Sequence, residues 1–279
     1  MGSFIQFKIY DKEDKFLLVQ NMAIRRFEVG TLKLEIHPSS QAAGEAAARA
    51  AAQALNQSDH LGDSIGVIFA TGASQLGTLH ALTQIPGLPW NKVRGFHLDD
   101  YIGMAADHPA SFRRYLRENL TQRVQMKEFF EIDVTAPDPK QICRNYAEKL
   151  RSVDPQLCLL GIGENGHLAF NEPSAADFDD PLDMKIVHLD TVCRQQQAAE
   201  GWFKTLQEVP ESAITLTIPT IFRVPKLIVS VPGVRKAEIV RRTLEERIST
   251  DCPATILRTH PDATIYLDTE SASELDGLT

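Results

Sequence analysis

Two segments of the chain carry side chains suited to proton transfer. Asp99 and Asp100 follow an apolar run that predicts a strand over residues 93–98. Adjacent carboxylates at the end of a strand are candidates for a general base, because burial and like charge raise a carboxyl pKa. The second segment, residues 156–173 (QLCLLGIGENGHLAFNEP), is a short apolar strand that ends in glycines. It presents a histidine and a glutamate where ligands of open α/β sheets gather, at the carboxyl end of a strand.

Both segments also have a structural interpretation. One aspartate could cap the next helix while the other is solvated, and His167 could be a surface residue on a plain turn. The three glycines of the second segment also spell G-x-G-x-x-G, the fingerprint of dinucleotide-binding sites, in which the glycines open a helix. Here HLAFNEP follows, which has no helical period and ends in proline. This disfavours a dinucleotide site.

A first candidate for anion binding follows the predicted strand at residues 64–70. The turn contains Gly72, Ala73 and Ser74, and a helix pattern begins directly after it. The first N–H groups of a helix have no partner within the helix, so such a turn can hold a phosphate. The signature G-K-[ST] of a P-loop is absent. An ordinary tight turn between a strand and a helix remains the alternative.

A second candidate follows the strand predicted at residues 225–233. Arg235 and Lys236 stand at the start of the next helix. Basic residues in a first helical turn oppose the helix dipole, and a bound anion would offset this. Two solvated surface cations are the structural alternative.

Composition limits the classes of function. The chain has 279 residues, a net charge of −8 and no run of more than two basic residues, which disfavours nucleic acid as a partner. Its four cysteines form no C-x-x-C pair, so a cysteine-based zinc site is not expected. The N-terminus lacks the pattern of a signal peptide, and no apolar run reaches 18 residues. We therefore expect a cytoplasmic protein without a membrane segment.

Strand and helix patterns alternate from about residue 60 onwards, which predicts a mostly parallel sheet with helices on both faces. We expect a single Rossmann-like α/β domain over residues 1–279, with a flexible tail at about 269–279. Predicted strands cover 31–37, 64–70, 93–98, 129–132, 157–160, 185–189, 212–218, 225–233 and 263–268. Predicted helices cover 41–56, 76–84, 108–119, 139–151, 190–208 and 236–244.

Taken together, FHLDDYIG, GIGENGHLAFNEP, the TGAS turn and the PGVRKA turn resemble the glucosamine-6-phosphate deaminase (isomerase) family in order and spacing. The resemblance covers about residues 30–268. It implies conversion of an amino-sugar phosphate into a ketose phosphate and ammonia, with no cofactor and no metal. Related 6-phosphogluconolactonases share the fold but have a Ser-Leu-Phe-Pro type segment where this chain has Phe170 to Pro173.

The resemblance also implies roles for the proton-transfer residues. Asp99 matches the base that moves a proton between C2 and C1 of the sugar, with Asp100 in support. His167 matches the residue that opens the ring, and Glu172 matches the carboxylate that supports it. Asn165 stands where other members have Asp or Asn. An asparagine can orient His167 but adds no charge.

For the phosphate, the resemblance implies the backbone of Gly72, Ala73 and Ser74, with charge from Lys236 and Arg194. Ala73 replaces a serine that is common in the family. Arg194 lies in CRQQQAAEGWF, which departs from the family's usual Arg-x-x-Asn pattern. The expected partner is a small sugar phosphate, not nucleic acid or a membrane. Family members form monomers, dimers or hexamers, so a homo-oligomer is compatible with the sequence.

Two other functions fit parts of the pattern. A 6-phosphogluconolactonase-type hydrolase would need His167 but no enolising Asp99. A non-catalytic sugar-phosphate sensor would need neither, and sensors of this fold usually carry a helix-turn-helix segment. The first 30 residues are too short and too strand-like for one. The sequence does not distinguish glucosamine from galactosamine 6-phosphate.

Overall fold

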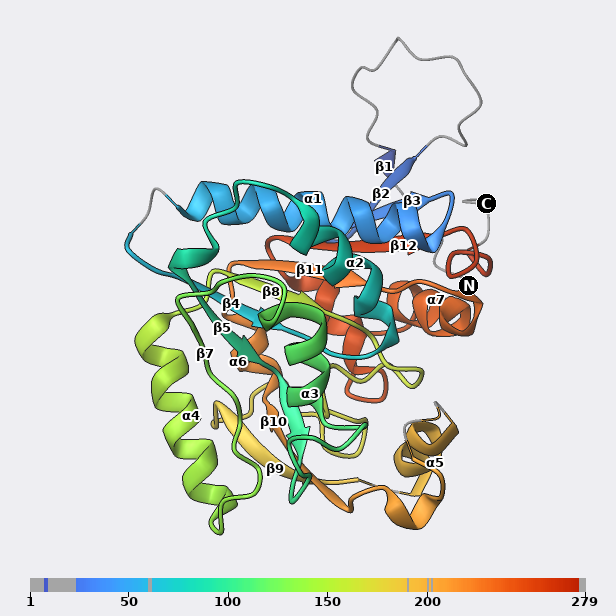
Figure 1. Cartoon of the computed structure of the whole chain (residues 1–279). Coiled ribbons are helices and arrows are strands. Elements are labelled where there is room, and N and C mark those ends of the chain that lie inside the picture. Colours follow the sequence, from blue (N-terminus) through green and yellow to red (C-terminus); the bar gives the residue numbers. More distant parts are fainter. Residues whose placement is uncertain are drawn as a thin grey trace.

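The computed structural model describes residues 8–9, 24–59, 62–189, 191–199, 201 and 203–275. Most of the N-terminal segment on which the signal-peptide and helix-turn-helix expectations rest lies outside these ranges. Within them, nine strands form one sheet (Figure 1). Their order across the sheet is β1 (Lys8–Ile9), β2 (Arg25–Val29), β3 (Leu32–His37), β12 (Ala263–Asp268), β11 (Lys226–Ser230), β8 (Leu157–Leu160), β4 (Ile65–Phe69), β5 (Val93–His97) and β7 (Glu128–Phe129).

The strands from β3 to β7 pair in parallel, while β1 and β2 add an antiparallel edge. From β4 the chain first moves outward to β5, then returns to β8 on the other side of β4. This reversal leaves the loops after β4 and β8 diverging from neighbouring strand ends, which is where open α/β sheets bind ligands. The predicted mostly parallel α/β domain is confirmed.

The helices that the structure describes are α1 (Ser40–Ser58), α2 (Ala73–Gln84), α3 (Phe112–Leu116), α4 (Pro139–Val153), α5 (Thr191–Ala199), α6 (Ile218–Phe222) and α7 (Ala237–Glu245). Short 3₁₀ turns lie at Trp90–Lys92, Leu206–Glu208, Val234–Lys236 and Pro253–Thr259, and a π-helical turn at Arg117–Thr121. None of the described helices combines the length and apolar character needed to cross a bilayer.

Both faces of the sheet are covered because strand side chains alternate. In β8, Leu157 and Leu159 pack with α1 and α2 on one face, whereas Cys158 and Leu160 pack with α4, α6 and α7 on the other. The alanine-rich α1 lies close to α2: a Cβ at Gly44 would come within 2.9 Å of the Gly77 backbone. Small residues therefore allow these two helices to pack closely against each other on this face of the sheet.

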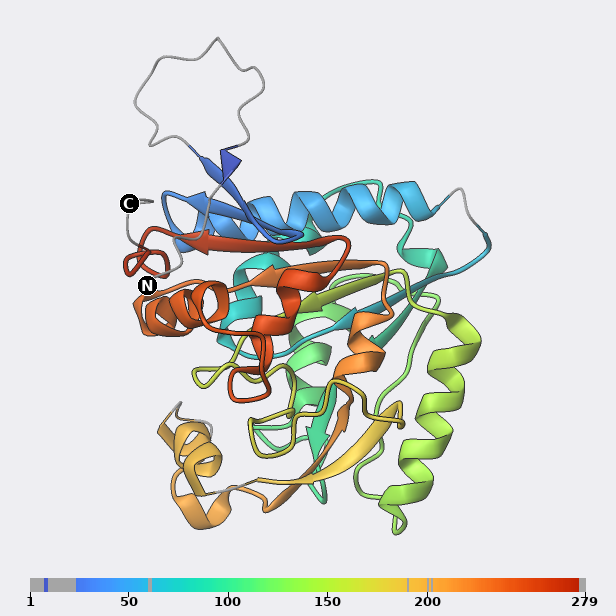
Figure 2. The ribbon, with the colours of Figure 1, turned by 180° about the vertical axis from the view of Figure 1, so that it is seen from behind.

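A second, antiparallel sheet has the order β6 (Asp99–Tyr101), β10 (Ser212–Leu216) and β9 (Met184–His188). This sheet and α5 lie at the end of the molecule opposite α1 in both views (Figures 1 and 2). Because β6 begins two residues after β5 ends, Asp99 lies where the large sheet passes into the small one.

Three segments differ from the sequence-based expectations. The helix expected at 108–119 begins only at Phe112, because Ser111 caps it through its side chain. The helix expected at 190–208 ends at Ala199, and Glu200 and Trp202 lie outside the described residues. The tail expected to be loose instead folds back as far as residue 275, where Leu275 is 2% exposed, because Ser271 N–H donates to the Asp268 carboxylate at 2.7 Å.

Candidate active site

A cleft of about 630 Å³ opens over the carboxyl ends of the central strands. The turns that follow β4, β8 and β11 contribute to its lining, as do Asp99 beyond β5 and Asp268 at the end of β12. The cleft therefore gathers residues from five strand ends that are far apart in the sequence. Asp99, His167, Gly72, Ala73, Ser74 and Lys236 all line it.

His167 belongs to a three-residue hydrogen-bonded group on the loop after β8. Its Nδ1 lies 2.8 Å from Asn165 Oδ1 and 2.8 Å from Glu172 Oε1. The Asn165 amide nitrogen also donates to the Glu172 carboxylate. Two acceptors at Nδ1 favour the tautomer with the proton on Nδ1. The other ring nitrogen, Nε2, is thus left for proton exchange with a ligand in the cleft.

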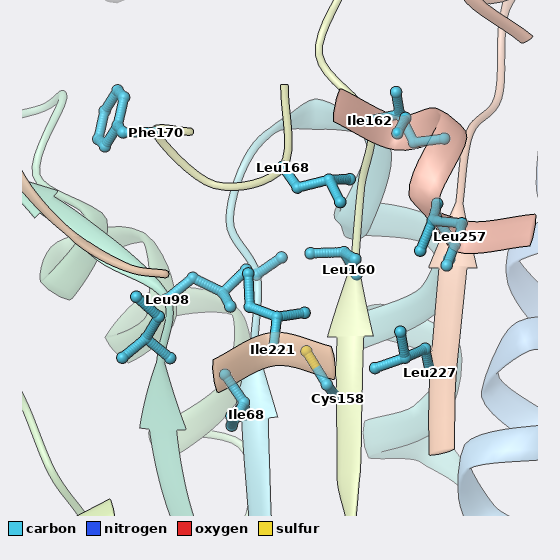
Figure 3. Packing of buried hydrophobic residues seen from close by; sticks show 14 of the residues in the cluster. Ile68, Leu98, Cys158, Leu160, Ile162, Leu168, Phe170, Ile221, Leu227 and Leu257 are labelled. Carbon is cyan, nitrogen blue, oxygen red and sulfur yellow. The ribbon is translucent and has the colours of Figure 1, made fainter. Parts of the chain in front are cut away.

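The loop that carries His167 is anchored at both ends. Gly163 N–H donates to His167 O at 3.0 Å, and Gly166 N–H donates to Gly163 O at 3.0 Å. The next residue, Leu168, is fully buried and points toward Leu160 in the core (Figure 3). The Asn171 amide then donates to the carbonyls of Leu168 and Leu216, each at 2.8 Å. These contacts hold the imidazole in place before any ligand arrives.

Asp99 is buried at the cleft wall, with 6% of its surface exposed. Burial, and then the neighbouring Asp100, hold the pKa of Asp99 well above its usual range. Its backbone is fixed from beneath by His97, whose Nε2 accepts from Ile132 N–H at 2.8 Å and whose Nδ1–H therefore donates to Asp99 O at 2.9 Å. Burial lowers the pKa of His97 to about 4, so its ring stays neutral.

Asp100 points away from the cleft and is completely buried. Its carboxylate accepts from Tyr101 N–H at 2.9 Å and from Arg113 Nε at 3.1 Å. Arg113 also donates to Met104 O. Burial raises the pKa of Asp100 to about 6, and Arg113 limits this rise. Asp100 and Arg113 thus form a buried ion pair directly behind Asp99.

We expect Arg113→Met to lower the free energy of unfolding by about 3–5 kcal/mol, because it leaves the Asp100 carboxylate buried without its cation. Urea denaturation at pH 8, where Asp100 is ionised, measures the loss. The loss should shrink at pH 5, because Asp100 then takes up a proton. Adding Asp100→Asn to Arg113→Met should recover much of it.

Arg114 is the matched control for this prediction. It is the next residue along the chain, but its ion pair with Glu118 is exposed. Arg114→Met should therefore cost less than about 1 kcal/mol. Equal losses for the two variants would mean that the buried pair with Asp100 is not the cause.

The candidate phosphate cradle lies where α2 begins. Gly72 has a φ of +96°, a conformation that favours glycine, and it turns the chain into α2. Tyr115 O–H donates to Gly72 O at 2.8 Å and holds this turn. Opposite, Gly233 N–H is bound by both carboxylate oxygens of Asp268, at 3.1 and 3.0 Å. Lys236 Nζ donates to Ile162 O at 2.8 Å.

Arg194, which the sequence analysis placed at the phosphate, lies outside the cleft. Its Nε donates to Val209 O at 3.1 Å, and its Nη2 donates to Leu206 O at 3.0 Å and Val209 O at 2.9 Å. The guanidinium therefore closes the turn after α5. Asn165 and Glu172 lie behind the lining, where they contact His167, and Asp100 lies behind Asp99.

Several residues of the site were not singled out from the sequence. Phe112, Gln197 and Asp268 line the cleft, and Arg113 and His97 lie behind Asp99. Only Asp268 carried a signal of its own, because it ends the last predicted strand. Among the described residues, no cluster of three or more His, Cys, Asp or Glu side chains could hold a metal ion.

Comparison with known proteins agrees with this architecture. The family model for glucosamine-6-phosphate isomerases and 6-phosphogluconolactonases matches residues 38–266. The chain belongs to this family. The matched region contains every candidate site residue named above except Asp268.

Other members of the family include curated relatives named glucosamine-6-phosphate deaminase. One from a species of Exiguobacterium is 36% identical over 204 residues, which are 73% of this chain and 78% of that protein. One from Thermoanaerobacter pseudethanolicus is 35% identical over 211 residues, 73% of this chain and 81% of that protein. The family resemblance stated from the sequence is confirmed.

Solved structures give the same result for the fold. A structure described as a monomeric glucosamine-6-phosphate deaminase has a TM-score of 0.79 at 30% identity, covering 86% of this chain and 99% of that one. A 6-phosphogluconolactonase from Thermotoga maritima has a TM-score of 0.68 at 17% identity, covering 84% of this chain and 98% of that one. The lactonase shares the fold.

Proposed function

We propose that this protein converts glucosamine 6-phosphate and water into fructose 6-phosphate and ammonia. The observation that carries this proposal is the buried carboxylate of Asp99 in the same cleft as His167. Moving a proton between two carbons needs a base of raised pKa, held rigidly beside the substrate. Hydrolysis of a lactone has no such step. The names of the curated relatives support the same reaction.

In the proposed reaction, His167 first opens the sugar ring. Its Nε2 exchanges a proton between the C1 hydroxyl and the ring oxygen, which breaks the C1–O5 bond and forms the aldehyde. Glu172 stabilises the imidazolium that forms when Nε2 takes the proton, since its carboxylate lies 2.8 Å from Nδ1. Asn165 orients both groups through its amide.

Asp99 then moves a proton along the open chain. The ionised carboxylate removes the proton from C2, while the C1 oxygen takes a proton from the ammonium group on C2, which gives an amino enol with its double bond between C1 and C2. Asp99 then returns its proton to C1. C2 is left as a protonated imine, which water hydrolyses to the ketose and ammonia, the ammonia leaving as the ammonium ion. Burial raises the pKa of Asp99 and so makes its carboxylate a stronger base.

Orientation comes from the phosphate group. We place it on the backbone N–H groups of Gly72, Ala73 and Ser74, where the N-terminus of α2 favours an anion. Lys236 supplies a positive charge from the turn after β11. Binding energy from this non-reacting group holds C1 and C2 against Asp99.

The test is ammonia release from glucosamine 6-phosphate, with galactosamine 6-phosphate, 6-phosphogluconolactone and unphosphorylated glucosamine alongside. Ammonia from glucosamine 6-phosphate supports the proposal, whereas ammonia from galactosamine 6-phosphate alone would keep the reaction class but make the other epimer the substrate. Hydrolysis of the lactone without ammonia release would make the protein a lactonase. No ammonia release and no lactone hydrolysis with any of these compounds would favour a non-catalytic sensor. Equal rates with and without the phosphate would contradict the proposed cradle.

We further propose a cytoplasmic location. Cys143, Cys158 and Cys252 are buried free thiols, which is typical of a reducing compartment. The partner we propose is a small sugar phosphate rather than nucleic acid, because the net charge of −8 opposes binding to nucleic acid.

A further inference from the structure

Gln197 is a buried amide at the cleft that the proposed reaction does not use. It lies on α5, lines the cleft and is 8% exposed. Its Oε1 accepts from Tyr101 O–H at 2.7 Å. An amide whose oxygen is held in this way presents its two N–H donors elsewhere. Within residues 24–59, 62–189, 191–199 and 203–275, Nε2 has no hydrogen-bond partner.

The phenol that holds Gln197 is itself fixed. Tyr101 is 1% exposed, and its ring centroid lies 5.1 Å from Phe112, 5.1 Å from Phe170 and 5.5 Å from Phe203. These three aromatic contacts hold the Tyr101 ring, and the orientation of the ring sets the position of the hydroxyl group. The amide that it binds is therefore held before a substrate arrives.

Tyr101 also ties Gln197 to the reacting end of the cleft. Asp99 and Tyr101 are two residues apart on β6, opposite Thr215 and Ala213 of β10, so their side chains share one face of the small sheet. The phosphate cradle is built on other elements, α2 and the turn after β11. A donor fixed through Tyr101 is thus placed for the sugar rather than for the phosphate.

We propose that Gln197 is a specificity residue whose amide Nε2 donates a hydrogen bond to one hydroxyl of the sugar, with Tyr101 as its positioning residue. This assignment rests on the proposed function. A bound sugar that lacks this hydroxyl covers the donor but leaves it unpaired. The cleft should then discriminate between the two sugars by about 10–100-fold.

The test compares Gln197→Met, which keeps the length of the side chain but removes both donors, with the unaltered protein. We expect kcat/KM for glucosamine 6-phosphate to fall about 10–100-fold, with a smaller fall for Tyr101→Phe. The double variant should lose no more than Gln197→Met alone, because Tyr101 acts through the amide. Additive losses, or a change of less than twofold in Gln197→Met, would overturn the proposal.

Deoxy analogues identify the contacted hydroxyl. The substrates are 3-deoxy and 4-deoxy glucosamine 6-phosphate. For the unaltered protein, one of them should lower kcat/KM by the same factor as the substitution Gln197→Met lowers it for the full substrate. In the Gln197→Met variant, kcat/KM for that analogue should equal kcat/KM for glucosamine 6-phosphate. Further loss with both analogues would contradict a hydroxyl contact.

Calorimetric binding separates failure of this assignment from failure of the proposed function. If no ammonia is released, the dissociation constants of glucosamine 6-phosphate still test Gln197, with the same 10–100-fold weakening expected in Gln197→Met. Inorganic phosphate is the control and should bind both proteins equally. An equal weakening for inorganic phosphate would place Gln197 at the phosphate instead and overturn the assignment.

Discussion

Replacing Asp99 by Asn should lower kcat for ammonia release by roughly 10²–10⁴-fold, the usual contribution of a positioned base. The amide has nearly the same shape as the carboxylate but cannot take the C2 proton. Binding of the sugar phosphate should change little, because the cradle at Gly72–Ser74 and Lys236 is untouched. We therefore expect the loss in kcat rather than in KM, measured by steady-state kinetics with glucosamine 6-phosphate.

The same substitution should stabilise the fold. Burial raises the pKa of Asp99 above its usual value of 3.8, so the folded protein favours the protonated carboxyl group. The stability that this group contributes is complete below pH 3.8 and is lost as the pH rises through the raised pKa. An asparagine side chain at this position does not ionise and carries no such penalty. The melting temperature of Asp99→Asn should therefore exceed that of the unaltered protein by at least roughly 2 °C at pH 8.

At pH 4 the two melting temperatures should converge, because Asp99 is then protonated. Asp100 is present in both proteins, so its own titration appears in both curves. A variant that is inactive and also less stable at pH 8 would contradict this account, since its lost activity could then reflect a damaged cleft. Retained activity at pH 8 would remove Asp99 from the role of base.

The position of Asp99 and His167 could be inferred from the sequence because both follow short buried strands. In a parallel sheet the carboxyl ends of the strands lie on one edge. Asp99 and His167 are 68 positions apart in the sequence, and this rule alone predicts that they lie at the same edge. The glycine-rich turns after β4, β8 and β11 were informative for the same reason. Periodicity and strand ends together sufficed for the α/β fold and for the placement of these residues at one edge of the sheet.

Residues held by long-range partners could not be found in this way. Arg113 lies in a helical pattern and shows no sign that its partner is Asp100. Gln197 lies in a polar stretch, CRQQQAAEG, where several residues looked equivalent. Arg194 was expected at the phosphate because the family resemblance implied it. In the structure the Arg194 guanidinium instead donates to the carbonyls of Leu206 and Val209. It can do so because the helix ends at Ala199 and the chain turns back over it.

The substitution with the second largest expected effect is Gly163→Ala. A Cβ at this position would lie 2.1 Å from His167 Cε1 and 2.2 Å from Nε2. Ordinary contacts between such atoms begin at about 3.4 Å, so one of the two groups must move by more than about 1 Å. The Gly163 backbone is hydrogen-bonded to His167 O and to Gly166 N–H, so it resists movement more than the imidazole ring does.

We therefore expect the imidazole to leave its position between Asn165 and Glu172. A displacement of about 1 Å at a catalytic group costs roughly 10²-fold in rate, and loss of the group costs up to about 10⁴-fold. Steady-state kinetics of Gly163→Ala should show a fall in kcat within these limits. Gly77→Ala is the matched control. Its Cβ would lie 3.9 Å from the nearest atom, in α2 and outside the cleft, so kcat should not change.

The route of the effect can be separated from general damage by combining variants. If Gly163→Ala acts only by displacing His167, it should add nothing to His167→Gln, and the double variant should match the single His167→Gln in kcat. A further fall in the double variant would mean that the methyl group also blocks the sugar. Unchanged activity in Gly163→Ala would mean that the ring position fixed by Asn165 and Glu172 is not the one that opens the sugar.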